Sequence, residues 1–213
     1  MQLYQYHHCP YCVRVDMVAN YKNLQHKKVY LLNDDEQTCF DLLNAKMVPI
    51  LQFADGSAIG ESLDIVAKLD EQGDNNKIIT PKVLSDDIDT LFAAVKSSTR
   101  ILTYPRSIRL GLPEFATQSA KDYFQAKKEK MIDMSFDMAM EISARHLAIV
   151  NSVLTKIPAL PISQTLSMDD VLVYPNLRNL SMVKGLVFPA AIKHYMEHIA
   201  ALTMTELYFA KAI

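Results

Sequence analysis

The sequence lacks a surplus of charge of either sign. Its 213 residues carry 22 Lys and Arg against 24 Asp and Glu, which gives a formal net charge of −2 at pH 7. Proteins that bind nucleic acid or anionic membranes through bulk electrostatics carry a marked basic excess. The composition therefore argues against both kinds of partner. Its 50% hydrophobic and 22% charged residues are ordinary for a folded globular protein.

Cysteine is also scarce. The chain has only three cysteines, at positions 9, 12 and 39. Small secreted domains that are held together by disulfides need a larger and even number. The composition therefore excludes a disulfide-stapled secreted fold.

Long apolar runs are missing as well. A membrane-spanning helix needs about 18 to 20 consecutive apolar residues. The richest stretch here, residues 142–153, is interrupted by Arg145, His146 and Asn151. The first residues lack the basic start, apolar core and cleavage site of a signal peptide. We therefore expect a cytoplasmic protein, in which a C-x-x-C pair is catalytic or metal-binding rather than structural.

Residues 1–72 alternate between short strand-like and helical segments. In order they predict a strand, a helix, a strand, a helix, a hairpin and a helix, near residues 3–6, 10–23, 28–32, up to 44, 49–59 and 61–69. Asp55-Gly56 marks the hairpin turn. Two parallel strands followed by an antiparallel pair, with C-x-x-C after the first strand, form the thioredoxin-like α/β pattern.

The rest of the chain has a different pattern of hydrophobic residues. Residues 73–84 are polar and then proline-containing, which predicts a linker, and residues 85–213 have helical periodicity. We expect a second, all-α domain with helices near residues 86–101, 113–136, 138–155, 169–182 and 189–200. Ser167 and Asp170 have the spacing of a capping box, which predicts a helix start and no catalytic role.

The strongest chemical signal is the run His7-His8-Cys9-Pro10-Tyr11-Cys12. Proline suits the first turn of a helix, because its missing N–H is not needed there. Cys9 then lies at the helix N-terminus, where unpaired N–H groups and the helix dipole stabilise a thiolate. Cys12 falls about one turn later, within reach of Cys9 but further inside the helix. This predicts Cys9 as the nucleophile and Cys12 as the resolving thiol.

Two other interpretations of the cysteine pair stay open. One is half of a zinc site with His7 or His8 as further ligands, although a closed site needs four ligands and no second C-x-x-C follows. The other is a pair of buried, inert thiols. We expect no metal, and we expect Cys39 to have no role.

Two further elements lie downstream at the spacing of a thioredoxin-like fold. Val48-Pro49 stands between a predicted helix and the hairpin, where such folds place a cis-proline that faces the redox cysteine. Glu61-Ser62 opens a helix. Ser62 can simply cap that helix, or the two side chains can hold a ligand that carries both ammonium and carboxylate groups.

These residues together resemble a known family. Cys9-Pro10-Tyr11-Cys12 is the tetrad typical of dithiol glutaredoxins. The chain resembles the larger bacterial glutaredoxin 2 type in four further stretches, at residues 29–35, 48–51, 61–66 and 174–180. The resemblance implies an N-terminal glutaredoxin domain packed on an all-helical domain, as in glutathione S-transferases. His7-His8 and Met47 depart from the family pattern.

The resemblance also implies an activity. The chain would reduce protein–glutathione mixed disulfides and protein disulfides, with glutathione as co-substrate and no tightly bound cofactor. Its partners would be glutathione and glutathionylated or disulfide-containing proteins, and we expect a monomer. Beside the two cysteines, the residues expected to contact glutathione are Tyr11, which would flank the site, Val48 and Pro49 at its cysteinyl backbone, and Glu61 and Ser62 at its γ-glutamyl end.

Two rival functions remain. A glutathione S-transferase activates the thiol of glutathione itself and needs no second cysteine, so the complete tetrad weighs against it. A non-catalytic binding protein with the transferase fold needs no reactive thiol at a helix N-terminus.

Overall fold

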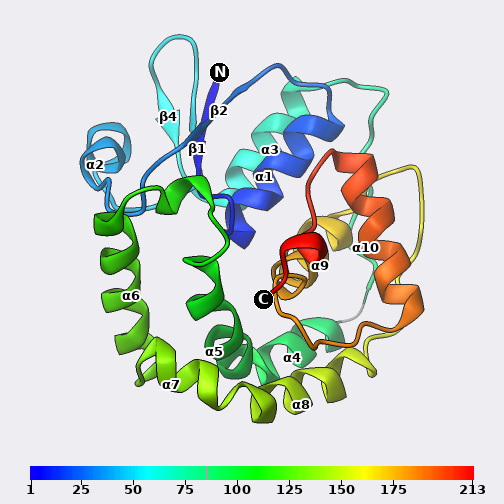
Figure 1. Cartoon of the computed structure of the whole chain (residues 1–213). Helices are drawn as coiled ribbons and strands as arrows, with labels where there is room; N and C mark the ends of the chain where they lie inside the picture. The colour runs from blue at the N-terminus through cyan, green and yellow to red at the C-terminus, as the bar shows by residue number, and fades with distance from the viewer. Residues whose placement is uncertain (85) are drawn as a thin grey trace.

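The computed structural model describes residues 1–84 and 86–213. It places an N-terminal sheet with flanking helices on top of a larger helical part (Figure 1). Residue 85, where the helical domain is predicted to begin, lies outside the described residues.

The sheet has four strands in the order β2-β1-β3-β4. They are β1 (Gln2–Gln5), β2 (Lys27–Tyr30), β3 (Ile50–Gln52) and β4 (Ala58–Ile59). β1 pairs in parallel with β2 and antiparallel with β3, which pairs antiparallel with β4. The expected parallel pair followed by an antiparallel pair is therefore confirmed.

Helices cover both faces of this sheet. Helices α1 (Pro10–Tyr21) and α3 (Ser62–Gln72) lie side by side on one face, and α2 (Gln37–Leu43) lies on the other (Figure 1). Two apolar clusters fill the two sides. The smaller one holds all three cysteines, together with Leu31 and Ile50.

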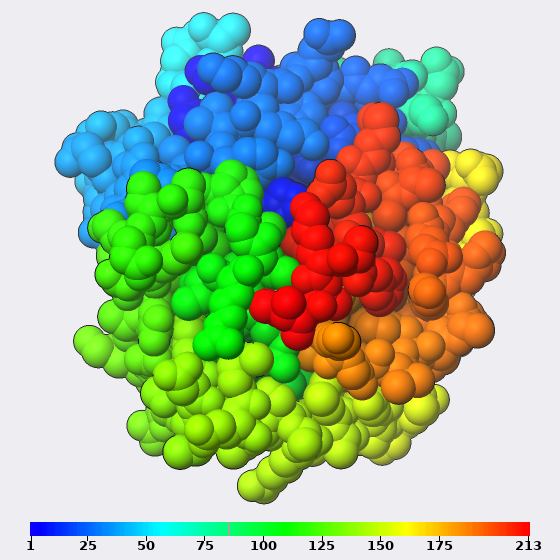
Figure 2. Space-filling view, in the orientation of Figure 1, coloured from blue at the N-terminus to red at the C-terminus, as the bar shows by residue number. Residues whose placement is uncertain are grey.

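The larger apolar cluster runs without interruption from α1 and α3 into the helical part of the chain. Helix α1 packs against α9 (Met168–Leu180) and α10 (Ala190–Thr203). Figure 2 shows the resulting continuous surface, on which the N-terminal residues meet the C-terminal segment directly. The two parts of the chain therefore share one core.

The helical part contains more helices than its periodicity predicts. Besides α9 and α10, the helices are α4 (Asp87–Ala94), α5 (Lys96–Ser107), α6 (Gln118–Ile132), α7 (Phe136–Glu141) and α8 (Ser143–Leu154), with short 3-10 turns at Pro113–Phe115 and Phe209–Lys211. The predicted helices over residues 86–101 and 138–155 are wrong as single units. The chain breaks at Val95 and Ile142, which leave helical geometry with ψ near 7°. Val95 is buried, so tertiary packing overrides local periodicity there.

The capping box at the start of α9 is confirmed. The Ser167 hydroxyl accepts from the Asp170 N–H, and the Asp170 carboxylate accepts from the Ser167 N–H. Next to it, the Asp169 carboxylate accepts from the backbone N–H of Val83 at 2.8 Å. The C-terminal end of the predicted linker is therefore tied to α9. Among the described helices, none is long and apolar enough to cross a membrane.

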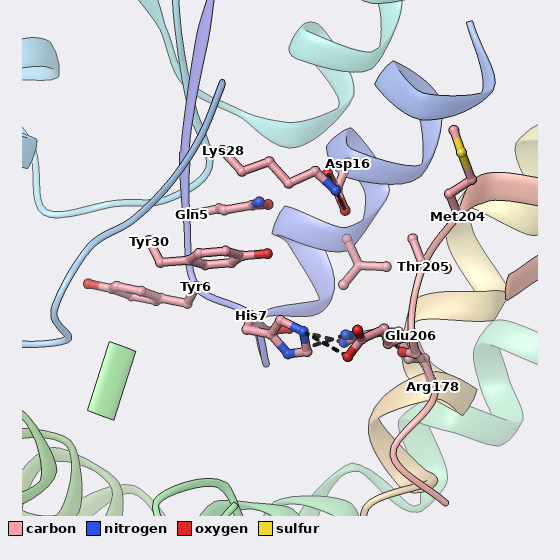
Figure 3. Close-up of a pocket in the computed structure, with 11 residues that line it drawn as sticks. Gln5, Tyr6, His7, Asp16, Lys28, Tyr30, Arg178, Met204, Thr205 and Glu206 are labelled. Atoms are coloured by element: carbon pink, nitrogen blue, oxygen red, sulfur yellow. Dashed lines mark hydrogen bonds and ion pairs between the residues drawn. The ribbon is translucent and has the colours of Figure 1, made fainter. Parts of the chain in front are cut away.

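A polar joint fixes the N-terminal segment to α9 (Figure 3). The buried guanidinium of Arg178 donates to the carbonyls of His7 and Glu206, at 3.0 and 2.7 Å, and to the Tyr208 hydroxyl. His7, Arg178 and Glu206 line a small cavity of about 120 Å³. Burial and the Arg178 charge lower the pKa of His7 to about 4, so its imidazole is neutral at pH 7. Arg178 therefore supplies the positive charge of the joint.

Removing this guanidinium should weaken the fold. Arg178→Met removes the hydrogen bonds from the guanidinium to the His7 and Glu206 carbonyls and to the Tyr208 hydroxyl, so we expect the free energy of unfolding to fall by about 3 kcal/mol. Urea unfolding followed by circular dichroism measures it. The matched control is Arg109→Met, because Arg109 forms only an exposed ion pair with Asp137; its expected cost is below about 0.5 kcal/mol. Equal unfolding midpoints for the two variants would contradict the structural role of Arg178.

Candidate active site

The two cysteines of the tetrad lie where strand β1 passes into helix α1. Cys9 is the N-cap residue of α1, and Pro10 takes the first helical position, as the sequence predicts. Cys9 is 9% exposed and Cys12, inside the first turn, is fully buried. All three cysteines are free thiols.

The environments of the two thiols shift their pKa values in opposite directions. A hydrogen bond from the Cys12 thiol lowers the pKa of Cys9 to about 7 against the cost of burial, helped by the charge of His8 and by the N–H groups of Tyr11 and Cys12. Burial and the neighbouring Cys9 raise the pKa of Cys12 well above its ordinary value. These opposite shifts favour the thiolate form at Cys9 and the protonated form at Cys12.

His8, next to Cys9, is held by hydrogen bonds to the helical domain. Its Nδ1 lies 2.6 Å from the Oε1 atom of Glu114, which also accepts from the His8 backbone N–H at 2.9 Å. Glu114 is completely buried, and His8 lowers the pKa of this carboxyl although burial raises it. The His8 ring also contacts the rings of Phe115 and Phe124. A hydrogen-bonded carboxylate from the helical domain thus orients the residue that precedes Cys9.

A cleft of about 460 Å³ opens over Cys9 between the two parts of the chain. The N-terminal part contributes Tyr6, His8 to Tyr11, Asn33 and Lys46 to Val48 to its lining. The opposite wall comes from α5, α6 and α9, including Arg100, Tyr104, Tyr123, Lys128 and Asn179. The thiolate therefore faces a space that both domains enclose.

The structure brings some of the other predicted residues into this cleft. The Val48–Pro49 bond is cis, and Val48 lines the cleft. Tyr11 also lines it and is 54% exposed at its rim, with the Arg14 guanidinium 4.9 Å from its ring centre.

The remaining predicted residues lie outside the lining of the cleft. Pro49 is buried, and Glu61 and Ser62 form the N-terminal end of α3. Ser62 is buried, whereas Glu61 is exposed and has a positive φ of 60°. Glu61, and not Ser62, is the N-cap residue of α3, and its side chain makes no capping hydrogen bond.

The zinc interpretation of the cysteine pair has no geometric support. The Nδ1 atom of His7 lies 2.8 Å from the Tyr208 hydroxyl, and His8 is engaged by Glu114. In the described part of the chain, no group of three or more His, Cys, Asp or Glu side chains is placed to hold a metal ion. Cys39 is buried on the α2 side of the sheet, with its thiol 3.7 Å from the Asp35 carbonyl.

Sequence reasoning missed the residues that reach the site from the other domain. Glu114 sits in a 3-10 turn, and Asn179 on α9 donates to the His8 carbonyl at 2.8 Å. They are more than 100 positions away from the tetrad in the sequence, and no local pattern marks them. The only available signal was the unusual His7-His8 pair, because a buried histidine beside a thiolate needs a partner.

Comparisons with known proteins identify the family. Residues 87–212 match the profile described as Glutaredoxin 2, C terminal domain, and residues 3–77 match the one described as Glutathione S-transferase, N-terminal domain. Glutaredoxin 2 of Escherichia coli K12 is 33% identical over 217 residues, with all of both chains covered.

Solved structures agree. The crystal structure of glutaredoxin 2 from Salmonella typhimurium in complex with glutathione superposes with a TM-score of 0.90 at 32% identity, covering 100% of this chain and 98% of that one. A glutathione transferase from Phanerochaete chrysosporium shares only the fold, with a TM-score of 0.62 at 11% identity over 96% of this chain and 98% of its own. The predicted architecture, a thioredoxin-like domain followed by an all-α domain as in glutathione S-transferases, is confirmed. With full-length identity above 30% and a family profile over most of the helical domain, the chain belongs to the glutaredoxin 2 family.

Proposed function

We propose that this glutathione-dependent oxidoreductase reduces protein–glutathione mixed disulfides with Cys9 as the nucleophile, and protein disulfides with Cys9 and Cys12 together. The observation that carries the proposal is the asymmetry of the pair. Cys9 has a pKa of about 7 and faces the cleft, whereas Cys12 is fully buried and its pKa is raised. A thiol with a pKa near ambient pH is the best attacking group in thiol–disulfide exchange.

Reduction of a mixed disulfide takes two exchanges. The Cys9 thiolate attacks the glutathione sulfur, forms a Cys9–glutathione disulfide and expels the protein thiolate, which takes up a proton. The thiolate of a second glutathione then attacks the glutathione sulfur of this intermediate. Oxidised glutathione leaves, and the Cys9 thiolate is restored. One free glutathione thiol is consumed for each mixed disulfide: its sulfur is oxidised to the disulfide level in oxidised glutathione, and the protein sulfur is reduced to the thiol.

For a protein disulfide, the intermediate joins Cys9 to the client protein. Cys12 lies within hydrogen-bonding distance of Cys9. After losing its proton it can attack the Cys9 sulfur, which releases the reduced client and leaves a Cys9–Cys12 disulfide. Two glutathione molecules then reduce this disulfide.

We assign glutathione to the N-terminal wall of the cleft. The backbone of Val48, beside the cis-proline, would pair with the cysteinyl part of glutathione, and Tyr11 would flank it at the rim. Glu61 and Ser62 would hold the ammonium and carboxylate of the γ-glutamyl end. The glutathione complex of the Salmonella typhimurium relative, which has the same fold at a TM-score of 0.90, supports a glutathione site here.

The expected partners and cellular compartment follow from this chemistry. The clients would be glutathionylated or disulfide-containing proteins, and a reducing compartment such as the cytoplasm would supply the glutathione. The chain would act as a monomer, because one chain encloses both cysteines and both walls of the cleft.

Serine substitutions separate the two cysteines. Cys9→Ser should abolish reduction of a glutathionylated peptide, because the attacking sulfur is gone. Cys12→Ser should keep at least about a third of that activity and lose reduction of a protein disulfide, which needs the second thiol. Coupled glutathione reductase assays on both substrates measure this. Undiminished activity of the Cys9 variant would refute the mechanism. Conjugation of an aromatic electrophile without disulfide reduction would favour a transferase.

The pH dependence of the thiolate is a second test. Alkylation of Cys9 by iodoacetamide should rise with pH through a midpoint near 7, the pKa of this thiol. Cys12→Ala removes the hydrogen bond that stabilises the thiolate, so the midpoint should move up by about 1 to 2 pH units. Cys39→Ala is the control and should leave the midpoint unchanged. An unshifted midpoint in the Cys12 variant would show that its thiol does not stabilise Cys9.

The γ-glutamyl assignment predicts a binding defect. Ser62→Ala removes a donor to the glutathione carboxylate, so KM for glutathione should rise about tenfold or more with little change in kcat. Ser57→Ala, in the exposed hairpin turn, is the matched control. If both variants keep the wild-type KM, glutathione is held elsewhere.

A further inference from the structure

The helical wall of the active-site cleft is built mainly from one face of each of two helices, α5 and α6, with Asn176 and Asn179 of α9 beside them. From α5 it takes Lys96, Thr99, Arg100, Thr103, Tyr104 and Ser107, which follow the i, i+3, i+4, i+7, i+8, i+11 spacing of a helix face. From α6 it takes Tyr123, Phe124, Lys127 and Lys128. Such spacing places each set on a single side of its helix. Both helices therefore present a continuous surface to the cleft.

This surface is strongly basic. Four of these ten residues are cations, and Lys46 adds a fifth from the opposite wall. No Asp or Glu is found among the residues that line the cleft in the described part of the chain. The whole chain has a net charge of −2, so the positive charge here is a local concentration that the composition conceals. A cleft lined by charge of one sign attracts ligands of the opposite sign.

The charges at the centre of this wall lack carboxylate partners. Lys127 reaches Glu36 at 3.3 Å, and the Lys46 ammonium donates to the Asp35 carbonyl and the Tyr6 hydroxyl. Within the described residues, Lys96, Arg100 and Lys128 make no ion pair. The Lys128 ammonium lies instead over the rings of Tyr104 and Phe124, at 5.0 and 5.5 Å.

Lys128 is also crowded by like charge. Its pKa is lowered by burial and then by the positive charge of Arg100. Holding two cations together in a partly buried place costs free energy, and a bound anion removes that cost. The cluster is close to the chemistry, because the Phe124 ring under Lys128 contacts the ring of His8, the residue before Cys9.

We propose that Arg100 and Lys128, with Lys96 beside them, form a subsite for the protein half of the mixed disulfide and select glutathionylated cysteines flanked by Asp or Glu. The inference rests on the proposed function, in which glutathione occupies the N-terminal wall. The leaving protein then extends along the opposite wall, formed by α5 and α6. Carboxylates on either side of its cysteine satisfy the unpaired cations there.

Matched peptides test this selectivity. Three glutathionylated peptides differ only in the residues beside the cysteine, which are Glu, Gln or Lys. At low salt we expect kcat/KM of the wild-type protein to be about fivefold to tenfold higher for the Glu peptide than for the Gln peptide, and lowest for the Lys peptide. Salt at 0.5 M should reduce the Glu-to-Gln ratio, because exposed charges are then screened.

Variants test whether the selectivity for the Glu peptide comes from Arg100 and Lys128. The Glu-to-Gln ratio should fall to between about one and two in Arg100→Gln/Lys128→Gln, and it should stay at the wild-type value in the control Lys193→Gln. Lys193 is exposed on α10 and does not line the cleft. A thermal unfolding midpoint equal to that of the wild type shows that the double variant is folded. A wild-type ratio of one, or a double variant that keeps the wild-type ratio, overturns the subsite. A double variant in which only KM for glutathione changes also overturns the subsite, because the cations then bind glutathione rather than the protein half of the disulfide.

Binding separates this inference from the proposed function. Calorimetric titration of the Cys9→Ser variant with the same peptides requires no turnover. Tighter binding of the Glu peptide by this variant, together with a wild-type protein that fails to reduce any of the peptides, would keep the subsite and refute the proposed function. If the variant binds the Glu and Gln peptides equally and the wild-type protein reduces both, the proposed function is kept and the subsite is refuted.

Discussion

The packing of helix α1 is the constraint on which the rest of the structure depends. Seven of its twelve residues are buried, because α1 lies between the sheet, α3 and the helices α9 and α10 of the second domain. A helix held on so many sides cannot shift without opening the shared core. Cys9 at its N-terminus is therefore fixed relative to both walls of the cleft. The chemistry needs this fixity, because disulfide exchange requires the attacking sulfur to lie in line with the disulfide that it cleaves.

Polar contacts from the helical domain complete the positioning. Arg178 holds the carbonyl of His7, Asn179 holds that of His8, and Glu114 binds both the N–H and the ring of His8. Each of the two residues before Cys9 is thus anchored by side chains that lie more than 100 positions later in the chain. In the proposed mechanism the helical domain is therefore part of the redox site, because it fixes the turn from β1 into α1 that carries Cys9.

Features with a local cause were predictable from the sequence. Pro10 marks the start of α1, Asp55-Gly56 marks the hairpin, and Ser167 with Asp170 marks the start of α9; each depends on residues within one turn of one another. The helix breaks at Val95 and Ile142 were not predictable, because they follow from packing and not from any helix-breaking residue. Glu114, Asn179 and the basic wall were missed for the same kind of reason: their roles depend on contacts between domains, which periodicity and spacing do not encode.

The net charge of the whole chain does not describe the charge of the cleft over Cys9. A value of −2 argues against binding through bulk electrostatics, yet five cations and no Asp or Glu are found among the described residues that line the cleft over Cys9. The acidic residues that balance the total pair elsewhere, as Asp16 does with Lys28 and Asp137 with Arg109. The field at Cys9 is set by charges within about 10 Å, the screening length at ordinary ionic strength. The proposed selection of acidic substrates therefore depends on the distribution of charge over the folded chain, and not on its sum.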